Sequence, residues 1–161
     1  MSQALEDLRE LKSIPDFEDR VAGEEYKYTT DKLEVVQINV GKVCNLACRH
    51  CHVEAGPART EVMDRKAMEA CLAVCREQKV ATIDITGGAP EMNPDFEWLV
   101  EEACKICGHV IVRTNLVILK EERYRHLPGF YADHKVEVVC SLPYYRAKEM
   151  NRVRGDGTFE T

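Results

Sequence analysis

Four short runs rich in β-branched residues alternate with helix-forming segments, and this alternation constrains the fold more than any other feature of the 161 residues. The runs cover residues 33–40, 80–86, 109–114 and 136–142. Apolar runs of this length are typical of strands buried within a sheet. Strands separated by helices are joined by right-handed crossovers, which make neighbouring strands parallel. The pattern therefore predicts an α/β fold with about four parallel strands.

The segments between the runs carry helix start and stop signals. Asp64 precedes a periodic apolar face that predicts a helix to about residue 78, and Asn93 with Pro94 predicts a second helix that ends before Gly108. A weaker helix is expected around residues 121–127. A complete eight-stranded α/β barrel needs roughly 250 residues. We therefore expect a partial, truncated βα barrel.

The N-terminal segment differs in composition from the rest. Residues 1–34 hold 10 acids and 5 bases, so they contribute −5 of the net charge of −6. Leu5, Leu8 and Leu11 recur at near-helical spacing and predict an amphipathic helix. We expect an acidic helical extension over residues 1–32 and a core over 33–161. The near-neutral core argues against nucleic acid as a ligand.

The start of the chain lacks the basic flank and apolar stretch of a signal peptide. The sequence also has no apolar run of about 18 residues, the minimum for a membrane span. These features predict a soluble, cytoplasmic protein with no membrane partner.

Eight cysteines are many for a protein expected in the cytoplasm, where thiols stay reduced, so metal or redox chemistry is the leading explanation. Cys44, Cys48 and Cys51 form a C-x3-C-x2-C loop directly after the first predicted strand. Iron–sulfur clusters are normally held by four cysteines, so three leave one iron open or require a fourth ligand from elsewhere. With His50 or His52 as fourth ligand, the same thiols also fit zinc, and spacing alone leaves both readings open.

The remaining cysteines have weaker signals. Cys71 and Cys75 lie on the apolar face of a predicted helix, where cysteine usually packs as a small hydrophobe. Cys104 and Cys107 form a C-x-x-C pair that is expected to pack in the core or at its rim, with a redox or metal role as the alternative. Cys140 ends the fourth predicted strand. Core packing is expected for it, and a substrate contact is the alternative.

The carboxyl ends of parallel strands meet at one edge of a sheet and usually carry the functional site. The first predicted strand leads into the cysteine loop, and the second ends in T-G-G-A-P-E at residues 86–91. Adjacent glycines allow close approach of a ligand to the backbone. The third strand leads to Arg113 and Asn115, and the fourth to Ser141. We expect these four segments to lie together.

The cysteine loop followed by the glycine motif resembles the radical S-adenosylmethionine (SAM) superfamily over residues 33–161. The resemblance implies a 4Fe-4S cluster on Cys44, Cys48 and Cys51, with the fourth iron chelated by the amino and carboxylate groups of SAM. It also implies an enzyme in which an electron from the cluster cleaves SAM to methionine and a 5′-deoxyadenosyl radical.

The same resemblance implies contacts to SAM. His50 would lie near the adenine, in a place where the family usually has an aromatic residue. The backbone of Gly87, Gly88 and Ala89 would hold the methionine amino group, whereas the usual acid after the glycines is displaced to Glu91. Asn115 and Ser141 would bind the ribose or the carboxylate. Arg113 would neutralise the carboxylate, and a salt bridge to an exposed acid is the alternative. These cofactor-binding residues are Gly87, Gly88, Ala89, His50, Arg113, Asn115 and Ser141.

The longer strings C-N-L-A-C-R-H-C-H-V-E-A-G-P (residues 44–57) and T-G-G-A-P-E-M-N-P (residues 86–94) resemble the arsenosugar-biosynthesis radical SAM proteins. That resemblance implies a transferase that adenosylates a small molecule, a methylated trivalent arsenic species, with an electron donor such as flavodoxin or ferredoxin. Members of that family are longer than this chain. An inactive truncated fragment and a non-catalytic zinc or iron–sulfur module are the alternatives.

Overall fold

The computed structural model describes residues 17, 19, 22 and 32–159. The helix expected over residues 5–11 lies outside the described residues. The chain divides into two units after Lys32, and the second unit, Leu33–Thr161, contains the sheet. No helix in the described part of the chain has the length and apolar character needed to cross a membrane.

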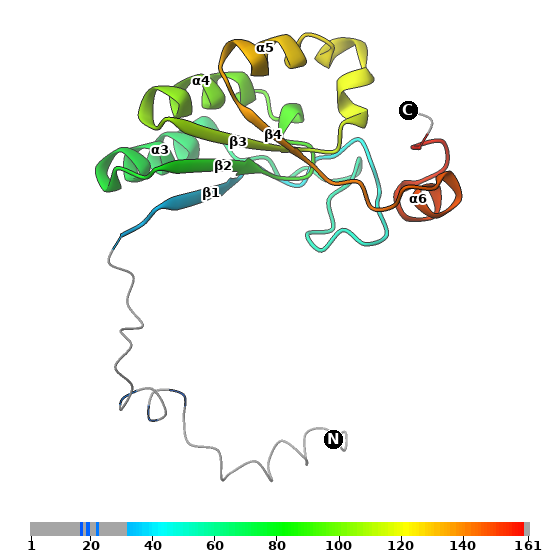
Figure 1. Cartoon of the computed structure of the whole chain (residues 1–161), viewed down its shortest axis with the longest axis horizontal. Coiled ribbons are helices and arrows are strands. Elements are labelled where there is room, and N and C mark those ends of the chain that lie inside the picture. Colours follow the sequence, from blue (N-terminus) through cyan, green and yellow to red (C-terminus); the bar gives the residue numbers. More distant parts are fainter. Residues whose placement is uncertain (1–16, 18, 20–21, 23–31, 160–161) are drawn as a thin grey trace. The chain divides into compact units, whose positions relative to one another are not determined.

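The sheet has four strands, all parallel, in the order β1-β2-β3-β4 (Figure 1). The strands are β1 (Val35–Asn39), β2 (Thr82–Thr86), β3 (His109–Thr114) and β4 (Glu137–Cys140). The predicted α/β fold with four parallel strands is therefore confirmed. Consecutive strands are neighbours, so their carboxyl ends line up along one edge of the sheet.

Three helices follow the first three strands and lie on the same side of the sheet (Figure 1). They are α3 (Arg65–Gln78), α4 (Phe96–Ile106) and α5 (Leu127–Asp133). Helix α3 begins as predicted, because the Asp64 side chain accepts a hydrogen bond from the Ala67 N–H at 2.8 Å. It ends at Lys79, which has a left-handed φ of 51°.

Two helix predictions need correction. Asn93 and Pro94 do not open α4, which begins at Phe96. The Asn93 amide instead donates to the carbonyl oxygens of Val40 and Met63, at 3.1 and 3.0 Å, and thereby holds the loop after β1.

The helix expected around residues 121–127 is also wrong. That region contains the 3-10 turns η2 (Val117–Lys120) and η3 (Glu122–Tyr124), followed by α5. Pro128 lies in the first turn of α5, where its missing N–H costs nothing, so it starts a helix there. A further helix, α6 (Ala147–Arg154), follows β4, where none was predicted.

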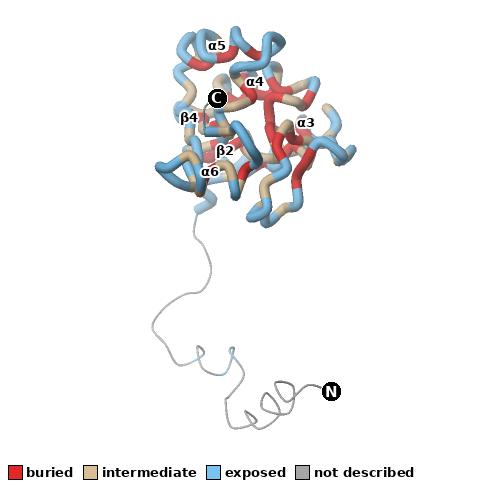
Figure 2. Tube along the Cα trace, turned by 90° about the vertical axis from the view of Figure 1, so that its right-hand side faces the viewer, coloured by how far each residue is buried: buried red, intermediate tan, exposed pale blue. Residues whose placement is uncertain are grey.

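The core lies between the sheet and the helices, and Figure 2 shows the buried segments gathered there. Strand residues facing the helices are apolar and buried, whereas the other face carries polar side chains, so the strands are not apolar on both faces as their composition indicated. Cys75 is fully buried in the core, and Cys71, Cys104 and Cys107 pack against it as half-buried free thiols, as predicted.

Candidate functional site

The loop after β1 is held by backbone hydrogen bonds rather than by a helix or a strand. The Lys42 N–H donates to the Glu61 carbonyl at 2.8 Å, and the Gly56 N–H donates to the Lys42 carbonyl at 3.0 Å. Gly41 has a φ of 138°, and a Cβ there would lie 2.4 Å from the Glu61 carbonyl oxygen. These contacts fix the two ends of the cysteine loop against each other.

The three loop cysteines line one cavity of about 150 Å³, which we call the three-thiol cavity. Cys44 is buried, Cys48 and Cys51 are half-buried, and all three are free thiols. Burial raises the pKa of the Cys44 and Cys48 thiols, and the neighbouring thiols raise both further by charge repulsion. All three side chains therefore line the same cavity.

Several N–H groups point at these sulfurs. The Leu46 N–H donates to Cys44 Sγ at 3.4 Å, and the Ala55 N–H donates to Cys51 Sγ at 3.3 Å. Such donors stabilise thiolates over neutral thiols. No three His, Cys, Asp or Glu side chains among the described residues converge as a group for a single metal ion. In an iron–sulfur cluster each cysteine binds a different iron, so thiols spaced around a cavity fit a cluster.

Gly87 and Gly88 pack directly against the backbone at the start of the cysteine loop. A Cβ on Gly88 would lie 2.4 Å from the Val43 carbonyl oxygen, and one on Gly87 would lie 3.0 Å from that of Gly41. The Gly88 and Ala89 N–H groups donate to these same two carbonyls, at 3.0 and 2.9 Å. Close packing against the loop therefore explains both glycines. Gly88 also lines the three-thiol cavity.

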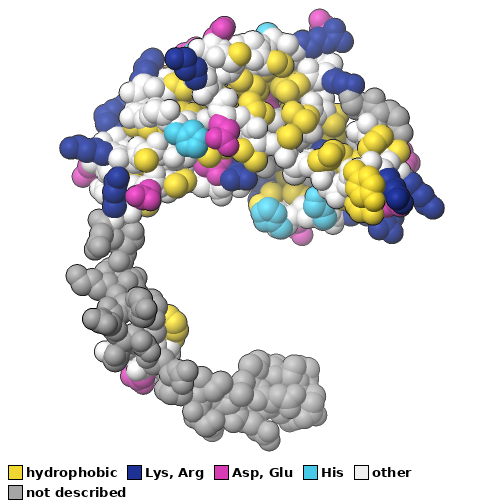
Figure 3. Space-filling model, viewed as in Figure 1, with side chains coloured by type: hydrophobic (Ala, Val, Ile, Leu, Met, Phe, Trp, Pro, Cys, Tyr) yellow, Lys and Arg dark blue, Asp and Glu magenta, His cyan; other side chains and the backbone are white. Residues whose placement is uncertain are grey.

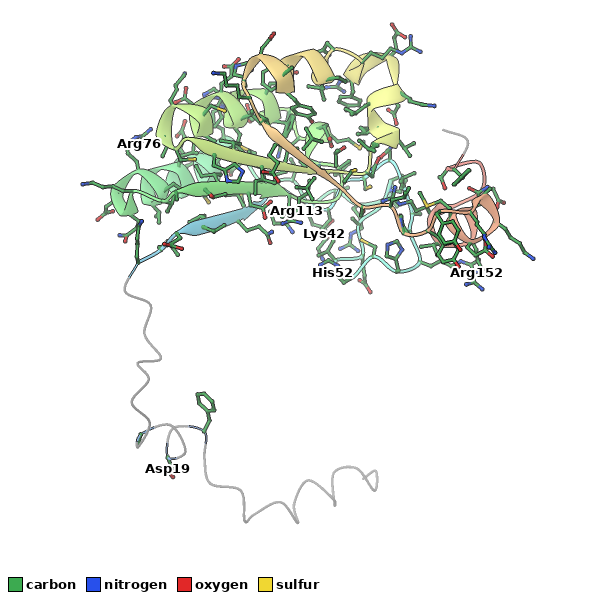
Figure 4. All side chains as sticks on the ribbon, in the orientation of Figure 1. Asp19, Lys42, His52, Arg76, Arg113 and Arg152 are labelled. Atoms are coloured by element: carbon green, nitrogen blue, oxygen red, sulfur yellow. The ribbon has the colours of Figure 1, made fainter. Side chains whose placement is uncertain are left out.

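Arg113 lies on the sheet face away from the helices (Figure 4) and binds a buried acid. Its Nε and Nη2 atoms donate to Asp84 at 2.9 and 2.8 Å, and Gln37 donates to the same carboxylate at 2.8 Å. Burial alone would raise the pKa of Asp84, but the hydrogen bonds from Arg113 and Gln37 outweigh burial and lower it. The salt bridge considered for Arg113 forms, but with a buried acid rather than an exposed one.

Asn115 and Ser141 reach the three-thiol cavity from the ends of β3 and β4. The Asn115 amide donates to Asn45 Oδ1 at 2.8 Å and to Cys44 Sγ at 3.7 Å, so it ties the cysteine loop to β3. His50 is exposed and lines the same cavity, where the sequence placed it beside the cysteines.

Arg154, which the sequence reasoning missed, is the buried cation of this cavity. It is 5% exposed and reaches back from α6. Its guanidinium donates to the Asn115 carbonyl at 3.1 Å, and to the carbonyl and the hydroxyl of Ser141. These partners are all neutral, and Nε is buried without a hydrogen-bond partner. A buried guanidinium with a free donor fits an anionic ligand group.

The spacing of Met150 and Arg154 could have revealed this arginine. The two residues are four apart on α6, so they share one helix face, and both are buried. An isolated apolar position is a weak signal for burial, and the segment 146–154 otherwise reads as a solvated basic stretch.

A second cavity, of about 230 Å³, opens beside the first along the strand ends. Gly87, Gly88, Arg113, Asn115, Cys140 and Ser141 are among its lining residues. Cys140 is exposed, so its predicted packing in the core is wrong. The reason is that β4 is the edge strand of the described sheet and carries little over its surface.

Glu91 does not take the place of an acid at the strand ends. It is 4% exposed and accepts a hydrogen bond from the Tyr131 hydroxyl at 3.2 Å, on the helix side of the sheet. Burial raises its pKa, more than the bonds from Thr114 and Tyr131 lower it. A role for Glu91 toward a ligand in the cavity is therefore not supported.

The fold and site together define a βα half-barrel with a cofactor cavity at the carboxyl ends of its strands. The chain belongs to the radical SAM superfamily, whose family model matches residues 38–137. This superfamily of enzymes uses a 4Fe-4S cluster and SAM as cofactors.

Individual relatives agree with this assignment. The chain is 26% identical over 112 residues to the antilisterial bacteriocin subtilosin biosynthesis protein AlbA of Bacillus subtilis, covering 70% of this chain and 25% of AlbA. It is 31% identical over 116 residues to the mycofactocin maturase MftC of Mycobacterium ulcerans, covering 72% of this chain and 31% of MftC. The chain thus spans less than a third of the length of these relatives.

The fold is similar to that of Streptococcus suis SuiB bound to SAM, with a TM-score of 0.64 and 21% identity. The match covers 80% of this chain and 29% of SuiB. At this identity the similarity concerns the fold alone. It supports a partial barrel of the radical SAM type.

Proposed function

We propose that residues 33–161 form the cofactor-binding core of a radical SAM enzyme that cleaves SAM reductively. The observation that carries this proposal is the shared cavity of the three thiols, Gly88 and Arg154. The cysteines offer soft sulfur ligands for a cluster. Arg154 offers a buried cation for the carboxylate of an amino acid group bound to that cluster.

Cys44, Cys48 and Cys51 would hold the cluster through three irons. Their free thiols, their partial burial and the N–H donors aimed at Cys44 and Cys51 support this role. Three protein ligands leave one iron open to SAM. When bound, the cluster supplies the electron that breaks the C5′–S bond and yields methionine and a 5′-deoxyadenosyl radical.

The protein's own task is to hold SAM in one orientation. Arg154 would neutralise the SAM carboxylate, because it is the buried cation of the cavity and has a free Nε donor. The backbone carbonyls of residues 87–89 would accept from the ammonium group, since the Gly88 and Ala89 N–H groups are already bonded to the loop. Asn115 and Ser141 would bind the ribose or the carboxylate.

Two further contacts belong to this proposal. His50 would lie against the adenine, supported by its place on the cavity wall. Arg113 would add positive charge from the neighbouring cavity while bound to Asp84.

For the substrate we propose a methylated trivalent arsenic species, which would make the protein an adenosyl transferase of arsenosugar biosynthesis. The two long strings around the cysteine loop and the glycine motif support this choice. The 5′-deoxyadenosyl radical would add to the arsenic lone pair and form an As–C bond. Loss of one electron from the resulting arsenic radical to the cluster, oxidised in the cleavage, and addition of hydroxide from water would complete the pentavalent product. The exposed thiol of Cys140 beside the glycine motif offers a thiophilic element a ligand near the reaction.

A peptide is the second candidate substrate. It is favoured by the names of relatives, a mycofactocin maturase and SuiB bound to the precursor peptide SuiA, the latter with a TM-score of 0.63. An acidic donor such as flavodoxin or ferredoxin would supply the electron. We propose a cytoplasmic location, because a low-potential cluster needs a reducing compartment.

Anaerobic reconstitution of the chain tests the proposal. We expect about four irons and four sulfides per chain, in the stoichiometry of the 4Fe-4S cluster, and absorbance that bleaches with dithionite. 5′-Deoxyadenosine should then form from SAM, and in the presence of dimethylated trivalent arsenic an adenosylated arsenic product should form in its place. Bound zinc without bleaching would identify a non-catalytic module. A bleachable cluster without SAM cleavage would identify an inactive fragment.

A further inference from the structure

A third cleft borders the cysteine loop. It has a volume of about 560 Å³ and lies between the loop and α6. Three exposed cations line it, Arg49, Lys148 and Arg152, against one acid, Asp156. None of the three cations belongs to an ion pair within the described residues. We call this surface the basic cleft.

The basic cleft borders the cysteine segment. Arg49 and Ala47 line the cleft, and both flank Cys48 in sequence. The Arg49 N–H donates to the Val153 carbonyl at 3.0 Å, which joins the loop to α6. Val153 lines the cleft, and the next residue, Arg154, lines the three-thiol cavity.

The cleft carries positive charge on a unit that is otherwise near-neutral. Residues 35–161 have a net charge of −1, whereas the exposed cations Arg49, Lys148 and Arg152 line the cleft against Asp156. Figure 4 shows Arg152 extending from α6 into solvent, and Figure 3 shows Lys and Arg side chains gathered at this end. Such a local excess of positive charge favours an acidic partner and speeds its association.

Exposed aromatic side chains directly precede α6. Tyr144 and Tyr145 stack with ring centroids 4.8 Å apart and are 38% and 65% exposed. Arg146 lies over the Tyr145 ring at 5.2 Å. Exposed tyrosine and arginine are enriched at protein interfaces, so the surface is better suited to a protein than to a small anion.

We propose that the basic cleft docks an acidic electron-transfer protein of the flavodoxin or ferredoxin class, which delivers its electron through the Cys48 side of the loop. This inference rests on the proposed function, because it requires the cluster. In each transfer the partner is oxidised by one electron and the cluster is reduced by one. No atom moves between the two proteins.

Charge reversal at the cleft tests the docking. We would compare the reconstituted chain with its Arg49→Glu/Arg152→Glu variant, using an acidic flavodoxin as the probe. We expect the Kd to rise at least about tenfold at about 0.05 M salt and the difference to shrink at about 0.5 M. The rate of cluster reduction by reduced flavodoxin should fall in parallel. Dithionite reduction and SAM cleavage should stay unchanged, because neither needs docking.

A matched control variant separates the effect of the cleft from the effect of the change in net charge. Lys66→Glu/Lys120→Glu makes the same change at exposed residues outside the cleft. We expect its Kd to stay within about twofold of the wild type. The docking proposal is overturned if both variants bind flavodoxin equally well, or if a single-stranded oligonucleotide binds the cleft and flavodoxin does not. Absence of a dithionite-reducible cluster would instead refute the proposed function.

Discussion

At the scale of single residues, Arg154 is a buried cation whose hydrogen bonds go to neutral oxygen atoms. A guanidinium buried among neutral oxygens has lost most of its hydration, and its Nε still lacks a partner. A carboxylate in the cavity would neutralise the charge of this guanidinium. Arg154 therefore links cofactor binding to α6, although it lies far along the chain from the cysteine motif.

Replacement of Arg154 by glutamine tests this role. Arg154→Gln keeps hydrogen-bonding capacity but removes the charge, so we expect SAM affinity to fall about 10- to 100-fold, as for a charge-assisted bond. Calorimetric titration of the reconstituted protein with SAM measures this, and iron content checks that the cluster is retained. Arg152→Gln on the same helix is the control. Equal SAM affinity in wild type and Arg154→Gln would contradict the assignment.

Asp84 provides a stability prediction at the same scale. Its carboxylate is 4% exposed and binds Arg113 and Gln37. Since the pKa of Asp84 is lower in the folded than in the unfolded chain, the stabilisation is present above the unfolded value of about 3.9 and is lost as pH falls through the folded value. Asp84→Asn should lower the free energy of unfolding by about 1–3 kcal/mol at pH 7.

Urea unfolding of wild type and Asp84→Asn at pH 7 and in acid measures that difference. We expect the gap between the two proteins to narrow in acid, where the wild-type carboxylate is protonated. Glu61→Gln, which breaks an exposed pair with Arg59, is the control and should change stability by less than about 1 kcal/mol. A gap that is independent of pH would show that the Asp84 charge is not responsible.

At the scale of elements, the cysteine loop and the glycine motif form one packed unit. The Gly88 Cα faces the Val43 carbonyl at a distance that leaves no room for a methyl group. Gly88→Ala must push two backbones apart, so we expect a loss of several kcal/mol of stability and of cluster retention. Gly108→Ala is the control, because nothing lies within 4 Å of its Cβ position. Thermal unfolding and iron content report both effects, and equal values for the two variants would contradict the close packing.

Local signals predicted the elements that depend on local chemistry. Asp64 caps α3 as expected because a cap bonds only to its own first turn. Asn93 has the same chemical character, but its amide binds Val40 and Met63, and no local pattern carries such distant partners. The three thiols of the cysteine loop could be predicted for the same reason as the Asp64 cap, because they lie within eight residues of the sequence.

Residues whose role depends on tertiary contacts could not be read from the sequence. Arg113 was assigned to a ligand or an exposed acid, whereas its partner Asp84 lies on the neighbouring strand 29 residues away. Arg154 was missed because its burial depends on how α6 folds over the strand ends. Propensity and periodicity describe faces of elements, and both side chains act across elements.

At the scale of the whole molecule, the cysteine loop joins parts that are otherwise separate. It contacts the end of β2 through Gly88, β3 through Asn115 and α6 through Arg49. The buried residues of α6 are Met150 and Arg154. We therefore expect that order in α6 depends on order in the loop, and that the sheet is independent of both.

Removal of the cluster tests this coupling. Without the cluster, nothing bridges the three thiols that share the cavity, so the loop should open more often and release α6. Hydrogen exchange followed by mass spectrometry should show faster exchange over residues 44–56 and 147–154 in the apo protein and in Cys48→Ser. The strands β2 and β3 should exchange at the same rate in both, because their hydrogen bonds lie in the core. Cys75→Ser, a change at a buried thiol outside the site, is the control for general destabilisation and should speed exchange in α3 instead. If α6 keeps its protection when the loop loses its own, the coupling through Arg49 and Arg154 is wrong.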